Sequence, residues 1–285
     1  MTVRRLMGPA LAAALFIAAP AAAQQRPLVT EDPEVVGAGL ILIEGGFDAQ
    51  KDVFYPASGL KGNLIRLPTL GLSIGVSSIA EIQLDGGLYD RLNITHTGVG
   101  PAPLAHMLTV TGDSTHVIPD MVVGAKVRMV SETPSRPAFA LRFATKLPNA
   151  SNESGLGLDT IDFHQQLLVG KTVRSVRIVG NVGLGILSDP TRGDNQNDVF
   201  EYGLSVARAV KEGVEIVGDI NGHVSTRGGT PPVGTETRSM IRIGGRFTKG
   251  TVRIDGGILL GMTSHDPSFG FTAGATYVFK GLTIQ

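Results

Sequence analysis

Arginines at a regular spacing are the residues of this chain that most directly suggest chemistry. Arg238, Arg242 and Arg246 recur every four residues, so on an extended strand their side chains point to the same face. Alternation places carboxylates on the matching face of the neighbouring segments. Such opposed charges could orient a dipolar or anionic solute in a polar channel. Alternatively, they could pair with one another and fill the interior. The charged residues predicted to line this inner face are Lys126, Arg142, Arg177, Glu215, Asp219, Arg238, Arg242, Arg246, Arg253 and Asp255.

A second candidate is the pair formed by His223 and Ser225, which are two positions apart and therefore share one face of a strand. A hydrolase needs a histidine that accepts the serine proton and a third group that orients the imidazole. The pair resembles the His-x-Ser motif of outer-membrane phospholipase A enzymes, which implies lipid hydrolysis. The predicted register turns both side chains inward, whereas a lipid-cleaving pair must face lipid. A polar histidine in an internal hydrogen-bond network is the alternative.

The remaining reactive side chains form no recognisable site. The chain has no cysteine, which excludes thiolate chemistry, and the other histidines lack a spacing typical of metal ligands. No phosphate-cradling glycine loop is present. The sequence therefore predicts neither a metal nor a cofactor, and its balanced charge argues against a nucleic-acid partner.

The elements that must position these side chains are strands with a period of two residues. Between Val214 and Val224, one face carries mostly isoleucine, valine and glycine, and the other carries Glu215, Asp219 and His223. About twelve such segments follow one another between residues 35 and 279, and many are 10 to 15 residues long, enough to cross a bilayer at a tilt. The fold class predicted is all-β: a closed antiparallel transmembrane β-barrel of about 12 strands. A soluble antiparallel sheet packed on a core is the alternative.

The connections between the segments alternate in length. Short polar turns are predicted at Ser77–Ile79, Thr133–Arg136, Thr172–Ser175, Lys211–Gly213 and Lys249–Gly250. Longer loops are predicted at Ala49–Leu60, His96–Val117, Pro148–Leu158, Pro190–Asn197, Thr226–Gly234 and Ser264–Pro267. Short periplasmic turns and long outer loops are typical of outer-membrane barrels, and both termini are then expected in the periplasm.

The first residues predict export. Arg4 and Arg5 precede an apolar stretch that ends in three alanines, which is the pattern of a signal peptide at residues 1–23, followed by one barrel domain at residues 24–285. Removing the two arginines leaves 23 basic and 25 acidic residues, a formal charge of −2. The predicted location is the outer membrane of a Gram-negative bacterium, with its lipids as partners.

Two further patterns resemble known proteins. The strand that ends in Tyr277 and Phe279 looks like the terminal signal that outer-membrane proteins present to the barrel assembly machinery. The segments Arg26–Pro33 and Ile43–Phe47, with Ile82–Gly86 and Val214–Gly222, are similar to bacterial outer-membrane "transporter" proteins of the phenol-degradation meta-pathway type. This resemblance implies a barrel that passes small, often hydrophobic or aromatic, compounds, and it supplies no functional residues.

The sequence thus favours a porin-like channel or transporter for passive passage of small solutes, without enzyme activity. Two alternatives stay open: an outer-membrane hydrolase using His223 and Ser225, and a closed structural barrel that interacts with other molecules through the loop His96–Val117.

Overall fold

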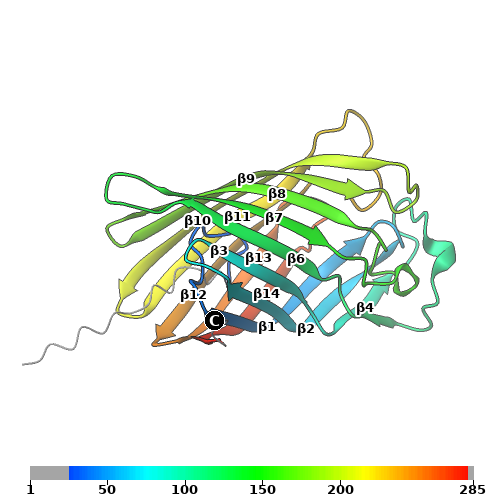
Figure 1. The fold of residues 1–285 in the computed structure, drawn as a ribbon. Helices are drawn as coiled ribbons and strands as arrows, with labels where there is room; N and C mark the ends of the chain where they lie inside the picture. The colour runs from blue at the N-terminus through cyan, green and yellow to red at the C-terminus, as the bar shows by residue number, and fades with distance from the viewer. Residues whose placement is uncertain (1–25, 282–285) are drawn as a thin grey trace, which may run out of the picture.

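A ring of antiparallel strands makes up most of the chain (Figure 1). The computed structural model describes residues 26–281, so the predicted signal peptide lies outside the described residues. The strands are β1 (Leu40–Tyr55), β2 (Leu60–Gly75), β3 (Ala80–Gly87), β4 (Asp90–His96), β5 (Ser114–Val117), β6 (Val122–Val130), β7 (Ala138–Lys146), β8 (Asp162–Val173), β9 (Val176–Ser188), β10 (Gln196–Lys211), β11 (Val214–Ser225), β12 (Arg238–Lys249), β13 (Val252–Gly261) and β14 (Phe269–Lys280). Twelve of them form the closed wall, and β4 and β5 are additional. The predicted fold class is confirmed.

The ring closes between the first strand and the last one. β1 pairs with β14 from Leu40 opposite Lys280 to Lys51 opposite Phe269, and it pairs with β2 on its other side. Every other wall strand pairs with its neighbours in the same antiparallel way. No sheet edge is therefore left in the ring of described strands, which is the condition for a β-structure in lipid.

Alternation along the strands separates an apolar outer surface from a polar interior. On β10, Phe200 and Leu204 are 43% and 51% exposed, whereas Glu201 and Ser205, which directly follow them, are buried. Outward apolar side chains that find no protein partner are stable only in lipid, where the ring also satisfies the backbone. The predicted outer-membrane location is confirmed by this surface. The two described helices, η2 (Ala105–Met107) and η3 (Asn152–Ser154), are short 3-10 turns, and no described helix could span a membrane.

The connections have the predicted asymmetry, with two corrections. The five tight turns lie at one end of the barrel, here called the turn end, and the longer connections lie at the opposite loop end. The range Ala49–Leu60 is not a loop, because β1 continues to Tyr55 and four residues connect it to β2. The predicted loop His96–Val117 contains the short strand β5.

These corrections share one cause, an interruption in the wall at the loop end. β2 pairs with β3 along its second half and with β4 along its first half, and Leu88 and Tyr89 separate these two strands. Pro68 of β2, which has no N–H to donate, lies opposite this interruption. Beyond it, β4 and β5 extend the sheet over a small apolar cluster made by Val53, Leu60, Leu64 and Leu92.

Candidate functional site

The interior of the barrel is occupied by the chain itself. The N-terminal segment, residues 26–36, contains no strand and contacts inward side chains of β2, β6, β7, β9, β11, β13 and β14. These contacts join residues 43 to 246 positions apart. The sequence predicted nothing of this arrangement, although it singled out Arg26–Pro33 as a recognisable opening.

The far end of the segment is anchored by Arg26. Its guanidinium donates to Thr69 Oγ1 at 3.0 Å and to Thr272 Oγ1 at 2.9 Å, and it lies 3.6 Å from a carboxylate oxygen of Asp255. Gly46 and Gly274, which face each other across β1 and β14, leave the space for it, because a Cβ on either residue would collide with the guanidinium. Glycine inside these strands thus permits close approach, as expected of strand glycines.

The middle of the segment is held by Asp219 on β11. One oxygen of this carboxylate accepts the backbone N–H of Val29 at 2.9 Å, the N–H of Thr30 at 3.0 Å and the Thr30 hydroxyl at 3.1 Å. Leu28 adds an apolar contact by packing in a buried cluster with Ala207 and Val217. A carboxylate that accepts several protein donors makes charge-assisted bonds, which are stronger than neutral ones.

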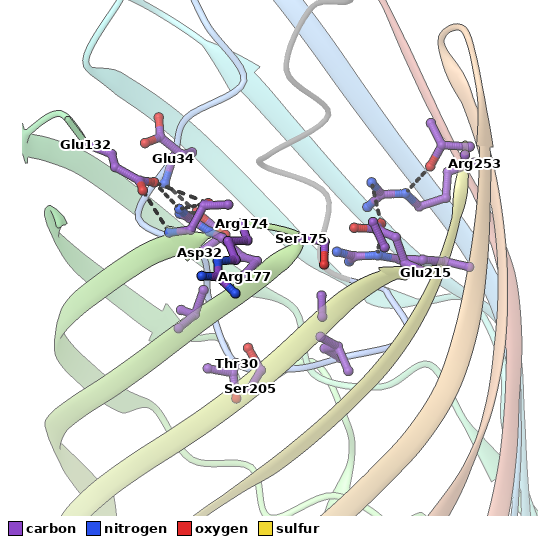
Figure 2. A pocket seen from close by; sticks show the side chains of 18 of the residues that line it. Thr30, Asp32, Glu34, Glu132, Arg174, Ser175, Arg177, Ser205, Glu215 and Arg253 are labelled. Atoms are coloured by element: carbon purple, nitrogen blue, oxygen red, sulfur yellow. Dashed lines mark hydrogen bonds and ion pairs between the residues drawn. The ribbon is translucent and has the colours of Figure 1, made fainter. Parts of the chain in front are cut away.

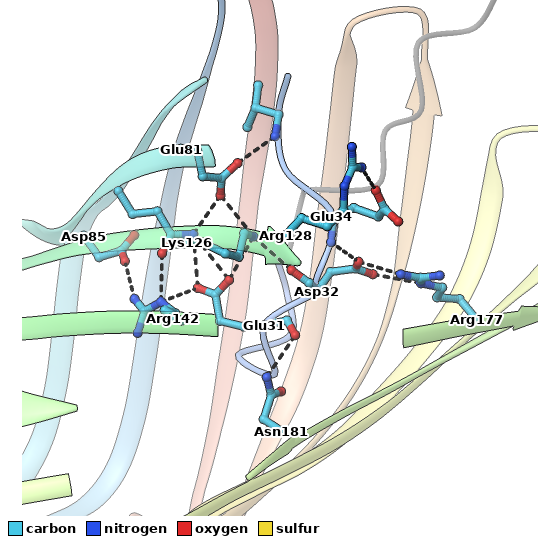
Figure 3. Close-up of polar contacts among 12 residues, drawn as sticks. Glu31, Asp32, Glu34, Glu81, Asp85, Lys126, Arg128, Arg142, Arg177 and Asn181 are labelled. Carbon is cyan, nitrogen blue, oxygen red and sulfur yellow. Dashed lines mark hydrogen bonds and ion pairs between the residues drawn. The ribbon is translucent and has the colours of Figure 1, made fainter. Parts of the chain in front are cut away.

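The acidic part of the segment meets a row of cations on the opposite wall (Figure 3). Glu31 lies 3.3 Å from Lys126 Nζ and 3.2 Å from Arg142 Nε. Asp32 is bound by both Nε and Nη2 of Arg177, at 2.9 and 2.6 Å. The next acid, Glu34, pairs with a fourth wall cation on β6. The segment is therefore fixed by ion pairs at three successive acidic positions.

The arginine row on β12 lies where the sequence placed it. Arg246, Arg242 and Arg238 stand opposite Glu215, Asp219 and His223 of β11, and Arg246 also faces Asp255 of β13. All ten predicted inner-face residues have buried or half-buried side chains. Lys126 pairs with Glu81 at 3.0 Å as well as with the segment. Whether these residues line an open path stays a prediction.

Two cavities lie on either side of the segment. At the turn end, a cavity of about 680 Å³ is lined by segment residues from Leu28 to Glu34 and by Arg177, Glu215 and Arg253 (Figure 2). At the loop end, a cavity of about 520 Å³ is lined by Arg242, His223 and other residues of the wall and loops. Thr30, Asp219 and Arg242 form the layer between them, since Asp219 bonds Thr30 and lies 3.9 Å from Arg242. This layer, made by the segment and the wall together, thus lies between two cavities whose linings carry charged side chains.

The hydrolase pair does not have hydrolase geometry. His223 Nε2 lies 2.8 Å from the backbone oxygen of Glu236, and the Ser225 hydroxyl exchanges hydrogen bonds with the Asn197 amide at 3.0 and 3.3 Å. Among the described contacts, none joins His223 to Ser225. The imidazole therefore belongs to an internal hydrogen-bond network, which is the alternative that the sequence left open. No group of residues that could hold a metal ion occurs in the part of the chain that the structure describes.

The side chains that sequence reasoning missed are those of the segment, chiefly Arg26, Thr30, Glu31 and Asp32. The sequence contains only an indirect indication of their role. Three acids lie within four residues, at positions 31, 32 and 34, and the strands β6, β7 and β9 carry cations but no acidic residue. Because the segment has no periodicity, pattern analysis assigns it no partner.

Comparisons with known proteins agree with this fold. No protein-family model matches the chain, and no curated protein sequence matches it. The structure is similar to that of the COG4313 outer membrane channel from Pseudomonas putida F1, with a TM-score of 0.60 at 12% identity, covering 87% of this chain and 98% of the other. It is also similar to the NanC porin, with a TM-score of 0.51 at 8% identity, covering 83% and 98%. At these identities the likeness shows the fold alone. Both similar structures are outer-membrane channels or porins, the class of protein that the sequence resembled.

Proposed function

We propose that this barrel is an outer-membrane channel for passive passage of small solutes, closed in this structure by its own N-terminal segment. The observation that carries the proposal is the presence of two cavities, of about 680 and 520 Å³, with one thin layer between them. A solid salt-bridged filling would leave no such cavities. The similarity to an outer membrane channel and to a porin supports the same class of function.

The charged wall gives the channel its lining. Arg242 lies near Asp219, Arg246 pairs with Glu215 and stands opposite Asp255, and Arg253 lies near Glu215. A solute that passes here therefore meets cations and carboxylates together. Rows of fixed charges of this kind select solutes by charge and orientation. The proposed function is passage of a solute without bond breaking, because neither His223 nor Ser225 activates the other. The mature chain is proposed to begin at residue 24 and to reach the membrane through the assembly signal in β14.

A reversible lock on the segment tests the proposal directly. An added Cβ on Gly203 would lie 2.9 Å from Thr30 Oγ1, so cysteines at these two positions come within reach of a disulfide. The chain has no other cysteine, so the variant Thr30→Cys/Gly203→Cys can form only this bond. Single-channel conductance is measured in planar bilayers, before and after reduction.

We expect the oxidised variant to be silent and the reduced variant to open as often as the single variant Thr30→Cys. Each single-cysteine variant serves as the control for the substitutions themselves. Equal conductance in the oxidised and reduced states would show that ions do not pass where the segment lies. A silent parent, together with a double-cysteine variant that stays silent after reduction, would refute the channel.

A further inference from the structure

Four cations of the wall face the acidic part of the segment and are here called the cation row: Lys126 and Arg128 of β6, Arg142 of β7 and Arg177 of β9. Each of them contacts a carboxylate of the segment. Lys126 is fully buried in this arrangement. The row is therefore a built site that already holds carboxylates.

The geometry of the row suits carboxylate groups in particular. Arg177 grips Asp32 with two parallel hydrogen bonds of 2.9 and 2.6 Å, the fork arrangement in which a guanidinium matches a carboxylate. The Glu31 carboxylate pairs with Lys126 and Arg142 and accepts a hydrogen bond from the Gln83 amide nitrogen at 3.3 Å. A neutral solute could satisfy neither of these groups of donors.

The wall does not neutralise the row by itself. Its own carboxylates at these cations are Glu81 on Lys126, Asp85 on Arg142 and Glu132 on Arg177. Four cations thus share three wall carboxylates, and the segment supplies three more. Glu132 also pairs with Lys171, and among the described contacts Arg128 has no wall carboxylate. Buried or half-buried cations whose charge is incompletely compensated are costly, so binding of a carboxylate is favoured when the segment is absent.

The segment is tethered to the barrel wall at its C-terminal end. It joins β1 through Gly37 and Gly39, whose φ angles of +100° and +72° are conformations that favour glycine. A tethered group competes at an effective concentration in the millimolar range. A solute with two carboxylates, one for Arg177 and one for Lys126 and Arg142, could compete at similar concentrations.

We infer that the cation row is a binding site for small organic carboxylates, and that the segment's acids occupy it in the closed state as an internal competitor. This inference rests on the proposed function and narrows its solutes to anions. Binding of the solute and closure by the segment then exclude each other. An anion that binds the cation row therefore shifts the channel toward its open state.

Calorimetric titration of the folded, full-length mature protein with succinate tests the site without any measurement of conductance. The variant Glu31→Gln/Asp32→Asn removes the competing charges, while Lys126 keeps Glu81 as a partner. We expect succinate to bind the variant at least about tenfold more tightly than the parent, because the displaced carboxylates held charge-assisted hydrogen bonds. Adding Arg177→Gln should abolish that gain. The uncharged analogue 1,4-butanediol should bind neither protein.

The controls separate the site from the fold and from the channel. Asp194→Asn, which alters a loop carboxylate that is 81% exposed, should bind succinate like the parent. Heat-modifiable migration checks folding, and Asp32→Asn alone serves if the double variant does not fold. Equal succinate affinity in the parent and the segment variants overturns the inference. A channel that opens but shows no preference for anions also overturns the inference, although the proposed channel function then still holds. Succinate binding in a protein that never conducts supports the site and refutes the channel.

Discussion

Replacing Asp219 by asparagine should loosen the N-terminal segment by an amount that the structure allows us to work out. One carboxylate oxygen accepts three hydrogen bonds from Val29 and Thr30, and the side chain is fully buried. A hydrogen bond to a charged group contributes about 1.5–3 kcal/mol, against about 1 kcal/mol for a neutral one. Asparagine keeps the shape and loses the charge, so three bonds weaken by roughly 1 kcal/mol each, about 3 kcal/mol in total.

That loss corresponds to about a hundredfold change in the closed-to-open equilibrium of the segment, since 1.4 kcal/mol is about tenfold. Amide hydrogen exchange measures this change in equilibrium directly, because the N–H groups of Val29 and Thr30 are themselves the donors to Asp219. We expect exchange in a peptide covering residues 27–36 to accelerate by about a hundredfold in liposomes, with the wall strands unchanged.

The matched control is Asp162→Asn, which alters a buried carboxylate of the wall whose contacts are Lys146 and the N–H of Ser188. Its segment should exchange at the parental rate. If the Asp219→Asn segment also exchanges within about twofold of the parent, then Asp219 does not hold the segment, and our account of the closed layer is wrong.

Three further outcomes follow from other parts of the molecule. Leu204→Arg, on the outer face at mid-strand, should lower the unfolding free energy in liposomes by about 2–4 kcal/mol, and a negligible loss would place this surface outside the hydrocarbon. Gly274→Val should expel the Arg26 guanidinium and speed exchange in the segment, while unaltered exchange would mean that the close approach of Arg26 is dispensable. Burial alone would raise the pKa of Asp189 in the outer loop, but hydrogen bonds from Thr191 and Asn195 outweigh it and hold the pKa below its usual value. The loop should therefore keep its full protease resistance above about pH 4 and lose it as the pH falls through the lower folded value, and Asp189→Asn should remove that dependence.

The wall of the barrel and the facing of its charges were predictable from the sequence because both follow from the period of two. Once Val214–Val224 is a strand, Glu215 and Asp219 must share a face, and the spacing of Arg242 and Arg246 aligns them with that face. The register then brings Asp219 opposite Arg242 and Glu215 opposite Arg246, as expected from the order of the strands.

The segment was not predictable in the same way. Residues 26–36 contain two prolines and no repeating pattern, and their partners lie far away in the sequence. Such contacts depend on which inner-face cations remain incompletely paired after the ring has closed, and no local pattern reports that. The end of β1 was missed for a related reason: Val53 is buried by Leu60, Leu64 and Leu92, an apolar cluster that exists only when the sheet extends beyond the barrel.

The position of the segment also has a mechanical consequence for the ring. Arg26 holds β2 and β14 on one side through Thr69 and Thr272, and Asp32 holds β9 on the other through Arg177. The seven residues from Arg26 to Asp32 thus connect opposite walls, and the connection resists any flattening or widening of the cross-section. Lateral pressure in the bilayer acts on the shape of the ring, so it acts on these same bonds. A thicker or more tightly packed membrane should therefore change how often the segment is released, even though no lipid touches it.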